Sequence, residues 1–186
     1  PHPYNGRPFL LSVGTIEPRK NHRDLLDAWF LLPQPRPFLV VIGKEGWRCE
    51  GISAELRAMH ALGAGKWIQD ADDWTVYQHM QHAMALVYPS RLEGFGFPPV
   101  EAMALGIPVI AGATPALEEL TADCAVLYQP GEPSVLAGWM ERALHDPMWR
   151  DILSERGRRR AKDFTWAKAA AGYADAYREA AGIDAA

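Results

Sequence analysis

Short apolar runs alternate along the chain with longer segments of helical periodicity. Residues 9–13 and 38–42 read as strands that end at Gly14 and Gly43. Further short strands are expected at 67–68, 85–88, 109–111 and 125–128. Continuous apolar runs rich in β-branched and aromatic residues suit strands that are buried on both faces of a parallel sheet.

Helical patterns fill the intervals between these strands. Helices are expected at 21–32, 53–62, 73–82 and 99–105, followed by three closing helices at 134–145, 147–162 and 166–181. Strands that alternate with helices predict an α/β fold, in which a Rossmann-like parallel sheet carries helices on both faces. Residues 1–8 lack the basic and apolar regions of a signal peptide and are interpreted as an interdomain linker, so that the folded domain is 9–186.

Composition narrows the class of protein. Hydrophobic residues make up 48% of the chain and charged residues 23%, which is ordinary for a globular protein. The formal net charge of −4 gives no general electrostatic case for binding nucleic acid. Cys49 and Cys124 match no metal or redox spacing and are expected to be reduced thiols of a cytoplasmic protein.

A basic cluster lies late in the chain, between Arg156 and Lys162. The preferred interpretation is a solvated helix face, and attraction to an anionic membrane surface is the alternative. No apolar run reaches the roughly 20 residues that a membrane-spanning helix needs.

The loop after the first predicted strand has the composition of an anion site. Ligands of doubly wound sheets bind beyond the carboxyl ends of the strands. Arg19 and Lys20 lie here directly before a helix, whose first amides carry partial positive charge. A diphosphate would suit this arrangement, although the two cations could also simply solvate a turn. The dinucleotide fingerprint Gly-x-Gly-x-x-Gly is absent, which argues against NAD or FAD.

The loop after the strand at 85–88 contains two glutamates around a glycine-rich segment. Gly94 and Gly96 allow close approach of the backbone to a ligand. Glu93 precedes them, and Glu101 follows in the next predicted helix. Carboxylates accept hydrogen bonds from sugar and ribose hydroxyls, so the pair resembles a clamp for a polyol. The alternative is a glutamate at a helix end and a second one in solvent.

Several other polar residues have ordinary explanations. His22 is interpreted as a capping or surface residue, and His79 and His82 as part of a helix surface without a third metal ligand. Asp70, Asp72 and Asp73 are equally well explained by a helix-capping turn. Trp47 follows the second strand in a glycine-flanked loop and could lie near a bound nucleotide.

The segment from Glu93 to Glu101 resembles the Glu-x7-Glu motif of retaining GT-B glycosyltransferases of family 4. Three further segments, 11–21, 41–47 and 102–109, are similar to blocks of the same family and occur in the same order. The likeness covers about residues 9–177. It implies that the chain is the C-terminal, donor-binding half of a GT-B fold.

The resemblance also implies roles for individual residues. Lys20, with Arg19 beside it, would bind the diphosphate of the donor, Glu101 the ribose hydroxyls, and Glu93 the transferred sugar. The amides around Phe95 and Gly96 would face the sugar or the phosphates, and the loop that begins at Ile68 would border the base. Gly14 and Thr15, in the loop after the first strand, are also assigned to the donor-binding residues. Many family members have arginine at the position of Thr15, so that phosphate charge would here rest on Arg19 and Lys20.

The expected activity is transfer of a hexose, mannose-like by resemblance, from a GDP-sugar or a UDP-sugar to a glycan or lipid-linked acceptor. No cofactor and no metal are expected. The acceptor would be bound by an N-terminal domain that is not part of this sequence, and the final helix would return towards that domain. Peripheral contact with the inner face of the membrane is compatible with this role. The alternatives are a GT-B-like sugar-nucleotide epimerase and a non-catalytic nucleotide-sugar-binding module.

Overall fold

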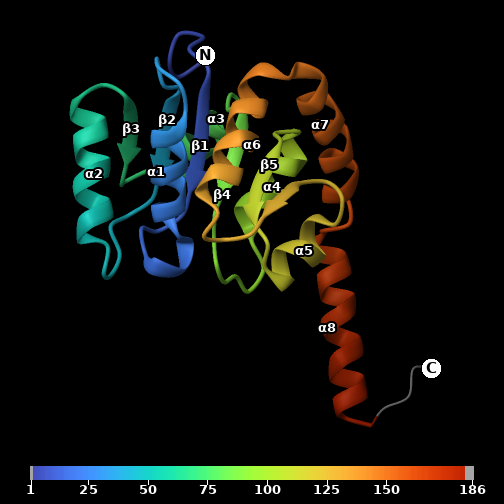
Figure 1. Cartoon of the computed structure of the whole chain (residues 1–186). Coiled ribbons are helices and arrows are strands. Elements are labelled where there is room, and N and C mark those ends of the chain that lie inside the picture. Colours follow the sequence, from blue (N-terminus) through green and yellow to red (C-terminus); the bar gives the residue numbers. More distant parts are fainter. Residues whose placement is uncertain (1, 183–186) are drawn as a thin grey trace.

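A computed structural model describes residues 2–182 of the chain and has one six-stranded sheet (Figure 1). The strand order is β3-β2-β1-β4-β5-β6, and every neighbouring pair is parallel. The strands are β1 (Phe9–Val13), β2 (Phe38–Ile42), β3 (Gly65–Ile68), β4 (Ala85–Tyr88), β5 (Val109–Gly112) and β6 (Val126–Tyr128). The predicted Rossmann-like α/β fold is confirmed.

Alternate residues of the central strands enter two separate cores. Leu10 and Leu39 belong to the core on one face of the sheet, whereas Phe9, Leu11 and Phe38 belong to the core on the other. Successive side chains of a strand point to opposite faces, so strands that are covered on both sides need apolar residues at every position. This is why the runs at 9–13 and 38–42 are continuously hydrophobic.

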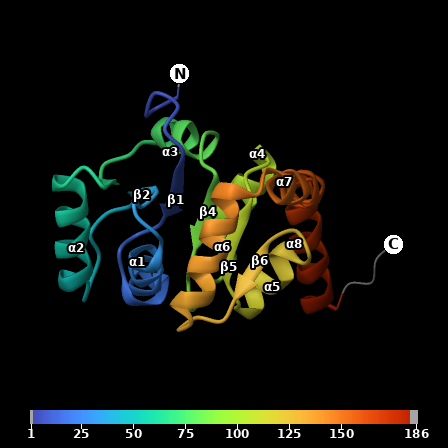
Figure 2. The same ribbon diagram turned by 45° about the horizontal axis from the view of Figure 1, so that its top comes forward.

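Helices cover both faces of the sheet (Figure 2). Side chains of α1 (His22–Leu31), α2 (Glu50–Ala61) and α6 (Pro133–His145) pack in one core. The other core receives α3 (Asp73–Met80), α4 (Phe97–Leu105) and α5 (Pro115–Thr121). Helix α7 (Pro147–Ala161) contributes Trp149 and Leu153 to the first core, and Gly157 lies against Met103 of α4.

Four features of the helices differ from the expectation. Helix α5 was not predicted, a short 3-10 helix η1 (Pro18–Lys20) precedes α1, α2 begins at Glu50 and α4 begins at Phe97. The first turn of α5 is capped by Thr114, whose hydroxyl accepts a hydrogen bond from the Leu117 amide, with Pro115 as the first residue. A capping threonine followed by proline is a helix-start signal, so α5 could have been recognised.

The final helix α8 (Trp166–Ala180) projects away from the rest of the molecule (Figure 1). It has no buried residue. Two of its aromatic side chains, Tyr173 and Tyr177, are 67% and 71% exposed. In the part of the chain that the structure describes, no helix has the length and apolar character needed to cross a membrane.

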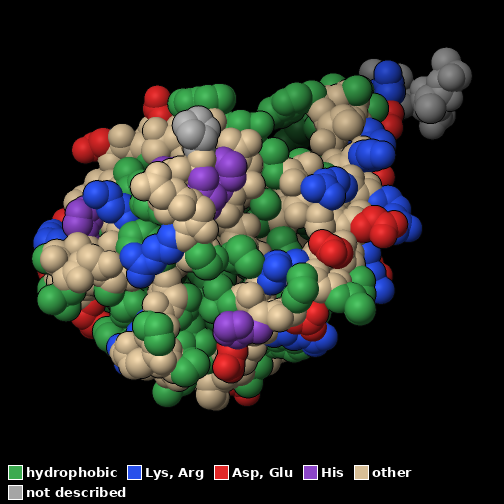
Figure 3. All heavy atoms as spheres, turned by 90° about the horizontal axis from the view of Figure 1, so that it is seen from above, with side chains coloured by type: hydrophobic (Ala, Val, Ile, Leu, Met, Phe, Trp, Pro, Cys, Tyr) green, Lys and Arg blue, Asp and Glu red, His purple; other side chains and the backbone are tan. Residues whose placement is uncertain are grey.

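The segment before β1 packs against the domain. The ring of Tyr4 lies 4.8 Å from that of Phe38, and its hydroxyl is 3.0 Å from Nε2 of His79. His79 is therefore buried, and its interpretation as a helix-surface residue is wrong. Figure 3 shows this face from above, with histidine side chains gathered near the chain start and charges of both signs interspersed.

The basic cluster of α7 caps the ends of two other helices. Arg160 donates to the carbonyls of Leu120 and Glu119 at the end of α5, and Arg158 donates to the Leu105 carbonyl at the end of α4. Cations at helix C-termini neutralise unpaired carbonyls and the negative end of the helix dipole. A solvated face is thus an incomplete description of this cluster, because two of its arginines hold helix ends together.

Candidate active site

The strand order places a crevice between β1 and β4. The chain passes from β1 outwards to β2 and β3, and then returns to β4 on the other side of β1. The helices that follow β1 and β4 cover opposite faces, so their preceding loops diverge at this point, which is where ligands of doubly wound sheets bind. The two loops are also joined to each other. The Arg91 amide donates to the Arg19 carbonyl over 2.8 Å, and Asn21 Nδ2 donates to the Pro89 carbonyl over 3.1 Å.

Lys20 and Glu93 form an ion pair across this crevice. Lys20 Nζ lies 2.6 Å from Glu93 Oε1 and donates a second hydrogen bond of 2.6 Å to the hydroxyl of Tyr88. The side chains of Lys20 and Glu93 are only 11% and 6% exposed. The 3-10 helix directs Lys20 here, and its alkyl chain lies over Gly14, where an added Cβ would be 3.6 Å from the lysine Cδ.

Arg19 extends the charged network to the rim of the site. Its guanidinium lies 2.7 Å from Glu17 Oε1 and 3.3 Å from Glu93 Oε2, and its side chain is 44% exposed. The second oxygen of Glu17 accepts a hydrogen bond of 3.2 Å from the indole of Trp47. Trp47 is thus tied to the loop that carries Arg19, with most of its ring in solvent.

The environment shifts the acidity of two groups in this network. Burial raises the pKa of Glu93, but hydrogen bonds led by the one from Lys20 outweigh it, and the net shift is downward. The carboxyl is therefore ionised at neutral pH. Burial, together with the neighbouring Glu93 charge, raises the pKa of Tyr88 well above its ordinary value, so the phenol stays protonated.

The glycine-rich loop after β4 has backbone amides that are not used within the described part of the protein. Within residues 2–182, the amides of Gly94, Phe95 and Gly96 donate to no other protein group. Gly96 has φ +107° and caps α4. Pro98 and Pro99 occupy the first turn of α4 and have no N–H, so this helix start offers fewer amides than expected. The amides that remain available come mainly from the loop itself.

Glu101 and Ile68 make no hydrogen bond or ion pair with Lys20 or Glu93 in the described part of the chain. Glu101 is exposed on α4, and no hydrogen bond or ion pair joins it to another described residue. Partial enclosure raises the pKa of Glu101, and the Asp73 carboxylate at the start of α3 adds to the rise. The Ile68 carbonyl already accepts the Gly43 amide over 2.9 Å. The structure therefore places Glu101 beside the loop that follows β3.

The remaining predicted residues define the floor and edge of the crevice. The Gly14 amide donates to the Ile42 carbonyl, and Thr15 is exposed beside it. Gly43 approaches so closely that an added Cβ would lie 2.0 Å from the Gly14 carbonyl oxygen. The loops after β1 and β2 are thus in direct backbone contact.

Two buried polar residues, His22 and Asp24, lie in the first turn of α1, directly after Lys20 and Asn21. His22 is 3% exposed, and Nδ1 of its ring has no hydrogen-bond partner in the described part of the chain, so its assignment as a capping or surface residue is wrong. Asp24 is 4% exposed and accepts hydrogen bonds from the Gly131 amide over 2.6 Å and the Tyr128 hydroxyl over 3.2 Å. Its carboxylate links α1 to the loop after β6.

No metal centre accompanies these residues. Across residues 2–182, no group of three or more His, Cys, Asp or Glu side chains is arranged to hold a metal ion. Asp72 accepts a hydrogen bond from the Thr75 amide and caps α3, which confirms the capping interpretation for this aspartate. Cys49 and Cys124 are buried and free.

Sequence reasoning missed three residues that contact the charged pair or its loop, namely Tyr88, Glu17 and Asn21. Tyr88 ends an apolar strand and reads as a core residue, although the last residue of a strand adjoins the loop that binds ligands. Glu17 stands two residues before Arg19, a spacing that brings the two side chains together in the turn.

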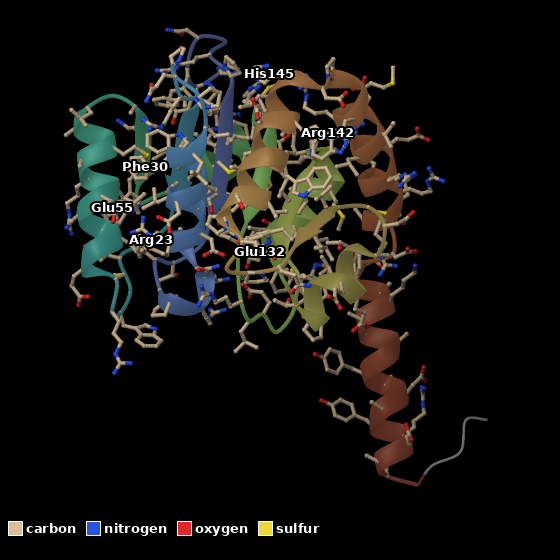
Figure 4. The ribbon with its side chains drawn as sticks, in the orientation of Figure 1. Arg23, Phe30, Glu55, Glu132, Arg142 and His145 are labelled. Carbon is tan, nitrogen blue, oxygen red and sulfur yellow. The ribbon has the colours of Figure 1, made fainter. Side chains whose placement is uncertain are left out.

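Two hollows lie away from the crevice. One, of about 440 Å³, is lined by residues of α7 and the end of α5, including Arg156, Arg160 and Cys124. The other, of about 400 Å³, lies at the opposite edge of the sheet and is lined by segments that precede β1 and β2, with His145 of α6 (Figure 4).

The comparison with known families identifies the chain. Residues 2–160 match the family described as glycosyl transferases group 1. The chain belongs to this family. The group 1 domain is 33% identical over 161 residues to O-antigen chain mannosyltransferase B of Escherichia coli, an alignment that covers 85% of this chain and 42% of that protein. It is 34% identical over 168 residues to a D-inositol 3-phosphate glycosyltransferase of Jonesia denitrificans, covering 84% of this chain and 39% of the relative.

Solved structures of glycosyltransferases share the fold of the group 1 domain. Sucrose-phosphate synthase of Thermosynechococcus elongatus superposes with a TM-score of 0.81 at 27% identity, over 95% of this chain and 46% of that one. The Anabaena protein HepE, solved with UDP-glucose, has a TM-score of 0.72 at 23% identity, over 83% and 44% of the two chains. The present chain spans less than half the length of these relatives. The group 1 domain is therefore a glycosyltransferase domain with the fold of one half of a GT-B enzyme.

Proposed function

We propose that this domain binds the donor of a retaining, metal-independent glycosyltransferase of family 4, which moves a mannose-like hexose from a nucleoside diphosphate sugar to a glycan or lipid-linked acceptor. The observation that carries the proposal is the Lys20–Glu93 pair at the crevice between β1 and β4, with Arg19 beside it and free loop amides above it. Its mannosyltransferase and inositol phosphate glycosyltransferase relatives agree with this assignment.

The chemistry asks mainly for stabilisation of a phosphate leaving group. In the transfer, the bond between the anomeric carbon and the β-phosphate oxygen breaks, and a bond to the acceptor oxygen forms on the same face. The acceptor proton goes to the departing phosphate oxygen, and the nucleoside diphosphate leaves. Lys20, Arg19 and the loop amides would stabilise the growing phosphate charge from fixed positions, which is the most effective form of electrostatic catalysis.

The two glutamates would divide the recognition of the donor. Glu93 is ionised and lies next to the cations, so it is placed to accept hydroxyl hydrogen bonds from the sugar that follows the diphosphate. Glu101 lies farther along α4 towards the loop after β3, where ribose would meet it. Catalysis would further require an acceptor-binding domain, in keeping with the greater length of the relatives.

Calorimetry with UDP, GDP, UDP-glucose and GDP-mannose tests this division. Glu101→Ala should lower the affinity for UDP or GDP by about 10- to 100-fold, because a hydrogen bond to a charged group is worth roughly 1.5–3 kcal/mol. Glu93→Ala should bind the nucleoside diphosphate at least as tightly as the wild type does. In this variant the Lys20–Glu93 ion pair does not have to break before Lys20 contacts the phosphates. The same variant should abolish any preference for the sugar-bearing donor.

A matched control is Glu118→Ala, which removes an exposed carboxylate from α5 and should change neither affinity. Failure of the wild-type chain to bind any of the four nucleotides would contradict the proposal and favour a scaffold module. Equal losses in the two glutamate variants for every ligand would contradict the assigned roles.

A further inference from the structure

The ammonium group of Lys20 has two protein partners rather than one. It donates 2.6 Å hydrogen bonds to Glu93 Oε1 and to the Tyr88 hydroxyl, and it lies 4.8 Å from the centre of the Tyr88 ring. An ammonium group has three N–H donors. Within residues 2–182 the third has no protein acceptor, so the group is held by two anchors while one donor remains for a ligand.

Donor binding would remove one of these anchors. This step rests on the proposed function, in which Glu93 contacts the sugar and Lys20 the diphosphate. If Glu93 turns both carboxylate oxygens to sugar hydroxyls, it gives up its 2.6 Å bond to Lys20. A lysine has a flexible four-carbon stem, and fixing it without a partner is entropically costly. Something other than Glu93 has to keep the ammonium in place.

Tyr88 is held in a fixed position by the sheet. It is the last residue of β4, pairs in register with Ala111 of β5, and is only 2% exposed. The phenol remains protonated because burial and the Glu93 charge raise its pKa. Its oxygen can therefore accept from Lys20 while its own proton remains available to the Glu93 carboxylate. A neutral anchor of this kind holds the cation without cancelling its charge, whereas a carboxylate would cancel it.

We propose that Tyr88 is a positioning residue whose phenol oxygen keeps the Lys20 ammonium directed at the donor diphosphate after Glu93 has turned to the sugar. The role concerns ligand binding through Lys20, and Tyr88 itself need not touch the nucleotide.

The substitution Tyr88→Phe separates the hydroxyl from the ring. UDP and GDP should bind this variant about tenfold more weakly than the wild type, as loss of one hydrogen bond to a charged group predicts. Uridine and guanosine, titrated by chemical shift, should bind unchanged because they have no phosphate. The matched control is Tyr4→Phe, since Tyr4 also packs against the sheet but its hydroxyl contacts Nε2 of His79, and its ring lies against Phe38 at the start of β2. This control should leave the affinity for the diphosphate as it is.

A double-mutant cycle with Lys20→Met shows whether Tyr88 acts through the lysine. The Tyr88→Phe effect should disappear when Lys20 is already Met, and an effect of equal size in both backgrounds would overturn the proposal. An unchanged UDP and GDP affinity in Tyr88→Phe alone would also overturn it. By contrast, a wild-type chain that binds neither nucleotide would refute the proposed function itself.

A measurement in which Tyr88 stays intact decides the question even if Tyr88→Phe does not fold. The ¹⁵N signal of the Lys20 ammonium, assigned by its loss in Lys20→Met, should be protected from exchange in the free wild type. It should remain protected in Glu93→Ala without nucleotide, where neither a carboxylate nor a phosphate holds the ammonium. Loss of protection in that variant would mean that Glu93 alone holds the lysine, contrary to the proposal.

Discussion

Three of the four residues that open α1, namely Asn21, His22 and Asp24, are polar and buried. Asn21 has φ +54° and uses its side chain to tie the loop after β1 to the Pro89 carbonyl. Asp24 ties the same helix to Gly131 and Tyr128. Buried polar groups are tolerated when their hydrogen bonds are made. Two of the three meet this condition, and His22, with an unpartnered Nδ1, does not fully meet it.

His22 should make the stability of the domain depend on pH. Burial, helped by the Lys20 charge, lowers its pKa from 6.5 to about 4. Between these values the unfolded chain binds a proton that the folded chain rejects, so the free energy of unfolding falls as the pH drops from 6.5 to about 4. Above 6.5 the contribution is fully present. The loss should be on the order of 2–3 kcal/mol.

Urea unfolding at pH 7, 6, 5 and 4 measures this dependence. The glutamine of His22→Gln does not titrate in this range. The free energy of unfolding of this variant should therefore fall by about 2–3 kcal/mol less than that of the wild type between pH 7 and pH 4. His145→Gln, which replaces an exposed imidazole on α6, should keep the wild-type slope (Figure 4). Parallel curves for the wild type and His22→Gln would contradict the prediction.

At this scale, sequence reasoning recognised charge better than it recognised burial. Arg19, Lys20 and Glu93 stood out because charged residues in loops at strand ends have few structural reasons to be there. Their mutual pairing did not follow, since it depends on how two loops 70 residues apart meet. Tyr88 and His22 were missed for the opposite reason. A tyrosine in an apolar strand and a histidine at a helix start look ordinary until their neighbours are known.

Among the elements, the loops after β1 and β2 touch through their backbones. The position of Gly43 leaves no room for a side chain, because its Cβ would lie 2.0 Å from the Gly14 carbonyl oxygen and 3.2 Å from the Thr15 amide nitrogen. Both obstacles are backbone atoms, which cannot turn away as a flexible side chain could. This close approach fixes the position of the loop that carries Arg19 and Lys20 relative to the loop after β2.

Gly43→Ala should therefore destabilise the domain by about 2 kcal/mol or more, in the range of overpacked positions. The variant should also have a lower affinity for UDP or GDP, because the loop after β1, which carries Arg19 and Lys20, has to move away from the loop after β2. Urea unfolding and calorimetry give the two readings. Gly138→Ala is the control, as its Cβ meets nothing within 4 Å on an exposed turn of α6, and it should stabilise by roughly 0.5–1 kcal/mol. A Gly43→Ala variant as stable as the wild type would contradict the close approach.

The strands and most helices were predictable, whereas several helix ends were not. Strands such as β1 and β2 are buried on both faces, so their nearly continuous apolar residues make them recognisable in the sequence. The start of α2 has Cys49 at its cap, without a side-chain hydrogen bond, so nothing local marks it. Helix α4 begins at Phe97, after Gly96 caps it in a left-handed conformation, so its start lies ahead of the two prolines.

At the scale of the whole molecule, the candidate site is open. Arg19 is 44% exposed, Glu101 is exposed, and α8 extends past the body of the domain with no buried residue (Figure 1). The relatives are more than twice as long as this chain. At this open rim the Arg19 guanidinium remains hydrated, which weakens its electrostatic contact with a phosphate compared with an enclosed site.

The isolated chain should therefore bind UDP or GDP weakly and transfer almost no sugar, since only half of the reacting geometry is present. Positioning of the second reactant and exclusion of water together account for a large part of enzymatic acceleration. A coupled assay for released UDP or GDP, run with UDP-glucose or GDP-mannose and a glycan acceptor, measures turnover, and calorimetry measures binding. The Lys20→Met chain serves as the blank, because any release that persists in it comes from a contaminating enzyme. Rapid release by the wild type that disappears in Lys20→Met would contradict the prediction, and would mean that the loops around Lys20 and Glu93 suffice for transfer.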